Sequence, residues 1–195
     1  MATIVRLPAG SADEIPVVPP MADEISMALS AAPSRLQAGA GVYALRATGF
    51  EQVRASTNGF TCIVNRDHPR ALKPTCYDAE GTATVLPTVL FEGVELMKGT
   101  PIAEIDKQIV AGLKNGRFTA PRRPGVAYML SGHIHGIAPD GTGFAFPPHV
   151  MFYAPNLSDR DIGSDGSFSE GLPSIGYDGP LGFMIVRCAA LEKHP

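Results

Sequence analysis

Three histidines lie close together in the chain, and their spacing could place them around one metal ion. His133 and His135 belong to the segment Y-M-L-S-G-H-I-H-G, and His149 follows 14 residues after His135. In a strand, residues i and i+2 point to the same face, about 7 Å apart. If strands 126–135 and 148–154 pair as a hairpin, His149 lies beside His135. Three imidazoles that leave one position open are the ligand set of a catalytic metal site.

Neutral imidazole binds Zn, Cu or Fe, so the three histidines predict a transition-metal ion as cofactor. Such an ion acts as a Lewis acid or lowers the pKa of a bound water toward neutrality. Ser131 and Tyr153 would line the open side of the site and are the candidate catalytic residues. The first hypothesis is therefore a mononuclear metal-binding protein or metalloenzyme. The pattern does not decide between hydrolytic and oxidative chemistry.

The alternation of residue types predicts which face of this hairpin is buried. The predicted core face carries Val126, Tyr128, Leu130, Ile134, Val150, Phe152 and Ala154. The opposite face carries Met129, Ser131, His133, His135, His149, Met151 and Tyr153. All three histidines thus fall on the predicted non-core face, together with two methionines and a tyrosine.

The H-x-H pair with a third histidine resembles the ligand layout of cupin-like β-barrels. The resemblance is partial, because a cupin's first motif usually carries a glutamate a few residues after H-x-H. This chain has Gly136 to Asp140 at that point, and few strands precede it. The alternative interpretation is that two histidines lie on the surface at a strand end, while backbone hydrogen bonding satisfies the third.

Length and composition restrict the class of protein. The 195 residues suit a single domain over 22–195 with an extended N-terminal arm over 1–21. Apolar residues make up 45% and charged residues 18%, which excludes an intrinsically disordered chain. The net charge of −3 argues against a nucleic-acid partner. No apolar run approaches the roughly 20 residues that span a bilayer, so we expect no membrane span.

Local patterns predict an α+β fold. Helices are predicted over 21–32, 87–98 and 101–115, and strands over 42–48, 50–56, 60–65, 126–135, 149–154 and 181–189. The dipeptide Asn58-Gly59 predicts a hairpin between the second and third strands. Helices grouped between two β sections favour an antiparallel sheet, or a partly open barrel, with two to three helices packed on one face.

The three cysteines are Cys62, Cys76 and Cys188. The short loop between the first two contains Pro69 and Pro74, and such a loop tends to bring its ends together. We therefore predict that Cys62 and Cys76 are paired or adjacent, either as a disulfide or as two buried thiols, depending on the compartment. Cys188 lies in an apolar run, so it is expected to be unpaired and buried.

Four short motifs give the chain a resemblance to other sequences over residues 25–188. They are N-G-F-T-C at 58–62, C-Y-D-A-E-G at 76–81, Y-M-L at 128–130 and P-H-V-M at 148–151. Together they resemble a group of uncharacterised, mostly exported bacterial proteins. The resemblance implies a periplasmic or secreted protein whose signal peptide is absent from this sequence, and it favours a Cys62–Cys76 disulfide. It implies no activity, and H-I-H-G departs from the group's pattern.

A second hypothesis needs no metal. In this alternative the protein is a non-catalytic module that binds a small ligand or forms an oligomeric interaction surface. The methionines and the tyrosine of the hairpin would form an apolar pocket for a small molecule, or a contact with a second copy of the chain. Composition does not separate the two hypotheses.

Overall fold

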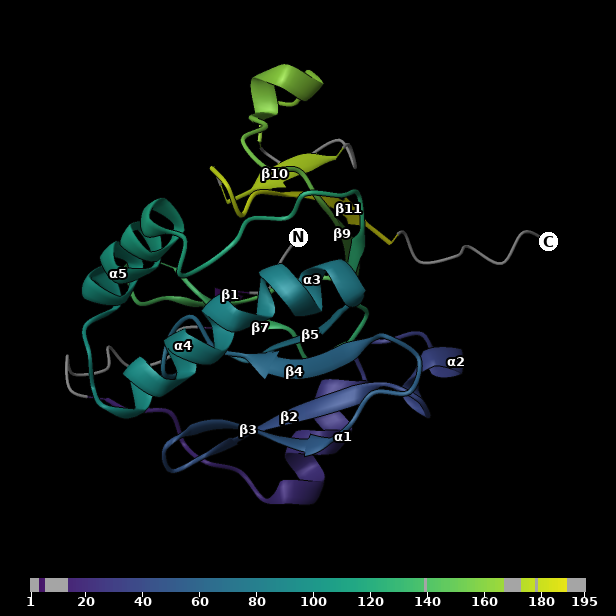
Figure 1. Cartoon of the computed structure of the whole chain (residues 1–195), viewed down its shortest axis with the longest axis vertical. Coiled ribbons are helices and arrows are strands. Elements are labelled where there is room, and N and C mark those ends of the chain that lie inside the picture. The colour runs from purple at the N-terminus through teal and green to yellow at the C-terminus, as the bar shows by residue number, and fades with distance from the viewer. Residues whose placement is uncertain (1–3, 6–13, 139, 167–172, 178, 189–195) are drawn as a thin grey trace.

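The computed structural model describes residues 4–5, 14–138, 140–166, 173–177 and 179–188, and its main feature is an open eight-stranded sheet (Figure 1). The strand order is β10-β11-β9-β6-β5-β4-β2-β3, and every neighbouring pair is antiparallel except β2 and β4. The strands are β2 (Gly41–Arg46), β3 (Gly49–Arg54), β4 (Thr61–Asn65), β5 (Lys73–Tyr77), β6 (Val126–Met129), β9 (His149–Tyr153), β10 (Ser174–Gly176) and β11 (Phe183–Arg187). The predicted α+β class with a mostly antiparallel sheet is confirmed, and the sheet does not close into a barrel.

A smaller sheet has the order β1-β8-β7. Its strands are β1 (Ile4–Val5), β8 (Gly143–Ala145) and β7 (His135–Ile137). The first of these belongs to the predicted N-terminal arm and pairs with β8 in antiparallel fashion. The division into an arm over 1–21 and a domain over 22–195 stays a prediction.

The described residues form five α-helices and one 3-10 helix. They are α1 (Met21–Leu29), α2 (Ser34–Gln37), α3 (Ala79–Thr84), α4 (Leu86–Met97), α5 (Ile102–Asn115) and η1 (Asp159–Ile162). The three predicted helices are present as α1, α4 and α5. Helix α5 ends at Asn115, and the Gly116 that caps it has a φ of +82°, which is left-handed backbone that favours glycine. Helix α3 was not predicted from the sequence, although Asp78 caps it by accepting a hydrogen bond from Gly81 N at 2.9 Å.

Helices cover both faces of the sheet, whereas the prediction placed them on one. Cys62 and Val64 of β4 pack in a core with α1 residues such as Ala28. Ile63, which points the other way, packs in a second core with residues such as Val89 of α4. The continuous apolar run of β4 is explained by this arrangement, because a strand buried on both faces does not alternate.

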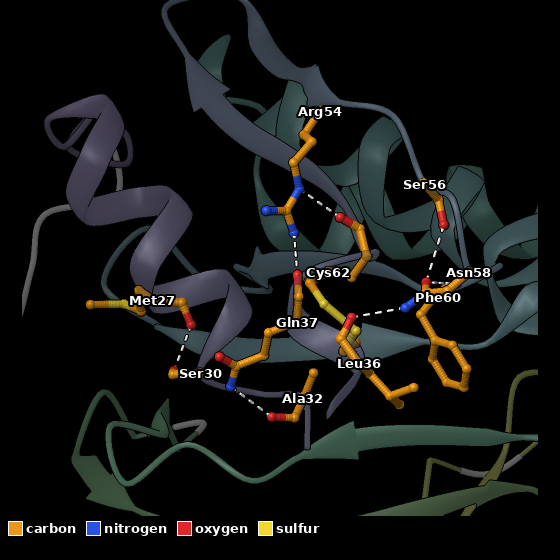
Figure 2. Close-up of a disulfide and its surroundings, with 12 residues drawn as sticks. Met27, Ser30, Ala32, Leu36, Gln37, Arg54, Ser56, Asn58, Phe60 and Cys62 are labelled. Carbon is orange, nitrogen blue, oxygen red and sulfur yellow. Dashed lines mark hydrogen bonds between the residues drawn. A yellow bond between two sulfur atoms is a disulfide. The ribbon is translucent and has the colours of Figure 1, made fainter. Parts of the chain in front are cut away.

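The Asn58-Gly59 turn forms, but it does not make the predicted hairpin. Strand β3 pairs with β2 at the edge of the sheet, and β4 lies parallel to β2 on its other side. The turn therefore joins two strands that are not neighbours. The Asn58 side chain fixes it by donating to Leu36 O at 2.8 Å and accepting from Phe60 N at 3.1 Å (Figure 2).

Cys62 and Cys76 form a disulfide, as the sequence suggested. They are directly opposite each other in the β4–β5 pair, their Cα atoms are 3.9 Å apart, and both side chains are fully buried on the α1 side (Figure 2). The prediction for Cys188 was half right: it is unpaired, but it is exposed rather than buried. It follows the end of β11, just beyond the part of that strand that packs in the core.

Replacing both Cys62 and Cys76 by Ala is expected to lower the free energy of unfolding by about 3 kcal/mol, because the bridge restricts a loop with a sequence separation of 14 in the unfolded chain. Urea unfolding of the oxidised proteins measures this difference. The matched control is Cys188→Ala, which removes an exposed thiol and should leave the midpoint unchanged. A double variant as stable as the parent would contradict the prediction.

Candidate functional site

The structure separates the three histidines that were predicted to share a metal. Strand β6 pairs with β9 as predicted, with Met129 opposite His149, but β6 ends at Met129. The predicted strand over 126–135 is wrong, because the chain turns at Gly132 and continues as β7 in the other sheet. His133 is therefore exposed in a turn, and His135 lies in β7, where its backbone pairs with Leu72.

His149 is buried, and its ring is held by local contacts. Its Nδ1 lies 2.8 Å from Pro147 O, and the ring packs edge-on against Phe146 with 4.7 Å between centroids. Burial lowers the pKa of His149, so the neutral form is favoured. These contacts match the alternative interpretation, in which backbone satisfies one histidine. Among the described residues, no group of three or more His, Cys, Asp or Glu side chains is placed to hold a metal ion. The His133–His135–His149 site, with its Zn, Cu or Fe ion, stays a prediction.

The two candidate catalytic residues take part in separate hydrogen-bond networks. Tyr153 is buried, and its hydroxyl donates to Asp78 Oδ1 at 2.8 Å. Ser131 is also buried, and its Oγ lies 2.8 Å from Ser30 Oγ beside α1 and accepts from His133 N at 3.1 Å. The hydrogen bonds of Tyr153 therefore lie on the α4 side of the sheet, and those of Ser131 lie on the α1 side. A catalytic role for either residue stays a prediction.

The face assignment of the hairpin was wrong. Met129, Met151 and Tyr153 are buried in the core beneath α3 and α4, whereas Phe152, predicted to be core, is 41% exposed. The partly buried Tyr128 packs against the α1 side of the sheet. Alternation was misleading here because β6 is covered on both faces, and because the outward face of β9 carries apolar residues such as Phe152.

A cavity of about 510 Å³ lies between this face of the sheet and helices α4 and α5. Its size is typical of small-molecule sites. The apolar part of its wall consists of Val85, Val89, Ile102, Ile109, Val110, Leu113, Met129, Met151, Pro180, Leu181 and Phe183. The two hairpin methionines, predicted from sequence to line an apolar pocket, are both in this wall.

Helix α5 lies beside α4 and away from the strands of the sheet (Figure 1), and it contributes several apolar side chains to the cavity wall. It contacts α4, and Gly112 lets Phe118 approach closely: a Cβ on Gly112 would lie 2.4 Å from the Phe118 ring. An apolar stripe at helical spacing, which is typical of a core contact, runs along α5 and consists of Ile102, Ile105, Ile109, Val110 and Leu113. Of that stripe only Ile105 is fully buried, whereas Val110 remains 50% exposed. Much of the stripe therefore borders the cavity instead of filling it.

Polar groups gather at one part of the wall, which we call the polar end. It consists of Asn65, Asp67, Lys73, Glu92, Asp106 and Tyr177. Lys73 forms an ion pair with Asp67, and the Tyr177 hydroxyl donates to Asp67 Oδ2 at 3.1 Å. Tyr177 reaches this position from the segment between β10 and β11 with a φ of +67°. Left-handed backbone at a non-glycine residue is strained, and such strain concentrates at functional sites.

Glu92 lies in the middle of α4, and none of the described residues gives its carboxyl a hydrogen bond or an ion pair. Burial raises the pKa of Glu92 to about 8, and the negative charges of Asp67 and Asp106 add to the effect. The Asn65 Oδ1 atom is buried and likewise has no hydrogen-bond partner among the described residues. The polar end therefore holds a carboxyl group and an amide oxygen to which no described residue forms a hydrogen bond.

Sequence reasoning missed the polar end, although one signal for it was present. Glu92 follows Val89 by three residues and precedes Leu96 by four, so it falls on the buried stripe of its helix. A charged residue at such a position indicates a special environment. Asp67 and Tyr177 carry no comparable signal, because they meet across 110 residues of sequence.

Comparison of the chain with protein-family models, with curated proteins and with solved structures finds no match. Within the part of the chain that the structure describes, no helix has both the length and the apolar character needed to cross a membrane. The functional proposal therefore rests on the residues that line the cavity.

Proposed function

We propose that this protein is a non-catalytic binding protein that holds a small amphipathic molecule between the sheet and helices α4 and α5. The observation that carries the proposal is the cavity itself, with a volume of about 510 Å³, a mostly apolar wall, three further hydroxyl-bearing residues (Thr75, Tyr77 and Thr88) and the charged groups of the polar end. Small-molecule sites have this composition, because apolar walls supply affinity and a few polar groups fix the orientation of the ligand.

Helix α5 offers apolar surface that a ligand can cover. Ile109, Val110 and Leu113 line the cavity. Covering apolar surface of this kind with an apolar ligand is favourable by about 25 cal/mol per Å² removed from water. A bound ligand would thus cover the apolar side chains of α5 that border the cavity. Binding is preferred over catalysis because Ser131 and Tyr153, the candidate catalytic residues, do not line the cavity.

The proposed place of action is the periplasm or the cell exterior. The Cys62–Cys76 disulfide supports an oxidising compartment, because such bonds persist there and are rare in a reducing cytosol. The resemblance to mostly exported bacterial proteins points the same way. A binding protein in this location would meet small molecules from the surroundings of the cell.

Binding is tested with N-phenyl-1-naphthylamine, an apolar probe that is neutral at pH 7.5 and fluoresces in apolar sites. Saturable binding of one probe per chain is expected. Leu113→Trp should weaken it about tenfold or more, because the indole would occupy the cavity, and a tenfold loss equals about 1.4 kcal/mol. The control is Ala111→Trp, at an exposed position of α5 that does not line the cavity.

A second variant, Val110→Trp, guards against a folding defect, because Val110 is half exposed at the cavity wall. Circular dichroism of each variant checks that it is folded. Absence of probe binding to the parent protein would overturn the proposal. Equal affinity of the parent and both folded cavity variants would do the same.

A further inference from the structure

We infer that the ligand of this cavity is a protonated primary or secondary amine carried on an apolar body. The inference rests on the proposed function and adds the chemical class of the ligand. It comes from the balance of charge and of hydrogen-bond donors at the polar end.

The polar end contains three carboxyl groups, from Asp67, Glu92 and Asp106, but the only ammonium group among its residues is that of Lys73. That ammonium group is engaged, because Lys73 forms an ion pair with Asp67 and lies 3.4 Å from the Tyr177 hydroxyl. No ion pair joins Glu92 or Asp106 to another described residue. Lys73 offsets Asp67, Asp106 has no ion pair with a described residue, and Glu92 gains a negative charge when it ionises beside a cation, so this part of the cavity wall favours a cationic ligand and disfavours an anionic one.

Hydrogen bonding gives an independent reason for the same ligand. Asn65 Oδ1 is buried without a partner, and the Glu92 carboxyl receives no donor from the described residues. Glu92 lines the cavity, and its ionised carboxylate is an acceptor only, so a ligand that brings donors satisfies it. An ammonium group brings N–H donors and a positive charge together. A hydroxyl brings one donor without charge, and a carboxylate brings none.

The burial of Glu92 also favours an amine as the ligand. Burial raises the pKa of Glu92, Asp67 and Asp106 add to the rise, and the ammonium group of Lys73, which is paired with Asp67, opposes it only in part. An ammonium nitrogen beside Glu92 would supply a nearby cation, and charge-assisted hydrogen bonds of this kind are the strong ones. The apolar wall of Val89, Met129 and Leu113 would then receive the body of the ligand.

The test compares three molecules of equal length, n-octylamine, n-octanol and sodium octanoate, as competitors of N-phenyl-1-naphthylamine at pH 7.5. Octylamine is expected to compete about tenfold better than octanol, and octanoate worst of the three. Glu92→Gln should reduce the preference of octylamine over octanol severalfold while octanol affinity stays the same. Asp106→Asn, at an exposed position, provides a second variant in case the first does not fold.

The matched control is Glu95→Gln on the same helix. Glu95 does not line the cavity, and its carboxylate is bonded to Lys98 at 2.7 Å and Thr100 at 2.9 Å. The amine preference should be unchanged in this variant.

If the fluorescent probe binds but octylamine competes no better than octanol, the amine inference is overturned and the binding function stands. The inference also fails if the preference is undiminished in both Glu92→Gln and Asp106→Asn. If the probe itself does not bind, the proposed function fails, and the inference fails with it.

Discussion

Replacing Glu24 by Ala is expected to lower the free energy of unfolding by about 3–5 kcal/mol, because it leaves a buried guanidinium without its counter-charge. Glu24 and Arg66 are only 1% and 2% exposed. The two Glu24 oxygens accept from Arg66 Nη1 at 2.7 Å and from Nη2 at 2.8 Å. Leu45 N also donates to Glu24 Oε1 at 3.3 Å. The carboxylate therefore links α1 to β2 and to the end of β4.

Urea unfolding at pH 7 measures this loss. The matched control is Glu104→Ala, which removes the exposed partner of Lys107, where the closest N–O distance is 3.9 Å. An exposed pair of this kind contributes about 0–1 kcal/mol, so the control should change the stability little. If Glu24→Ala lost no more stability than Glu104→Ala, the assigned role of the buried pair would be wrong.

Replacing Glu92 by Gln is expected to stabilise the protein at alkaline pH and to leave it nearly unchanged near pH 4.5. Burial raises the pKa of Glu92 to about 8, from an ordinary value of 4.5. Between these two values the folded state keeps a proton that the unfolded state has released, so parent stability falls as the pH rises. The effect is complete above pH 8. At about 1.4 kcal/mol per pKa unit, the gain for Glu92→Gln at pH 9 is on the order of 5 kcal/mol.

Unfolding free energies of both proteins at pH 5, 7 and 9 test this expectation, because titrations common to the two proteins cancel in the difference. Glu95→Gln serves as control with the opposite sign. Hydrogen bonds from Lys98 and Thr100 lower the pKa of Glu95, so its removal should slightly destabilise the protein. A difference between Glu92→Gln and the parent that is constant from pH 5 to pH 9 would contradict the assigned burial of this carboxyl.

The predictions that succeeded depend on nearby residues, and those that failed depend on distant ones. Helix α5 was found because its apolar stripe and the closing Asn115-Gly116 are local signals. The Asn58-Gly59 hairpin failed because the place of β4 is decided by its parallel pairing with β2. A dipeptide determines that the chain turns there, but the strand beside which it then lies depends on long-range pairing.

The candidate site was harder to predict for a related reason. Alternation identifies an outer face only when one face meets water, and here the faces of Tyr128 and Met129 are both covered. In the same way, the apolar stripe of α5 was evident, but periodicity does not show whether side chains or an open cavity lie opposite it. The histidine hypothesis required one strand over 126–135, and the turn at Gly132 separates the parts that it joined.

The loop closed by Cys62–Cys76 contains Asn65, Asp67 and Lys73, three residues of the polar end. The sulfur bridge lies on the α1 face of the sheet, and the cavity lies on the other. Ordering a side chain or loop on ligand binding costs about 0.5–1.5 kcal/mol for each immobilised side chain. The bridge would lower this entropic cost, because it limits the conformations of the loop before a ligand binds. If the cavity binds the proposed ligand, oxidation of the two buried thiols would prearrange the residues of the polar end on the opposite face, and ligand affinity would then depend on the redox state of the compartment.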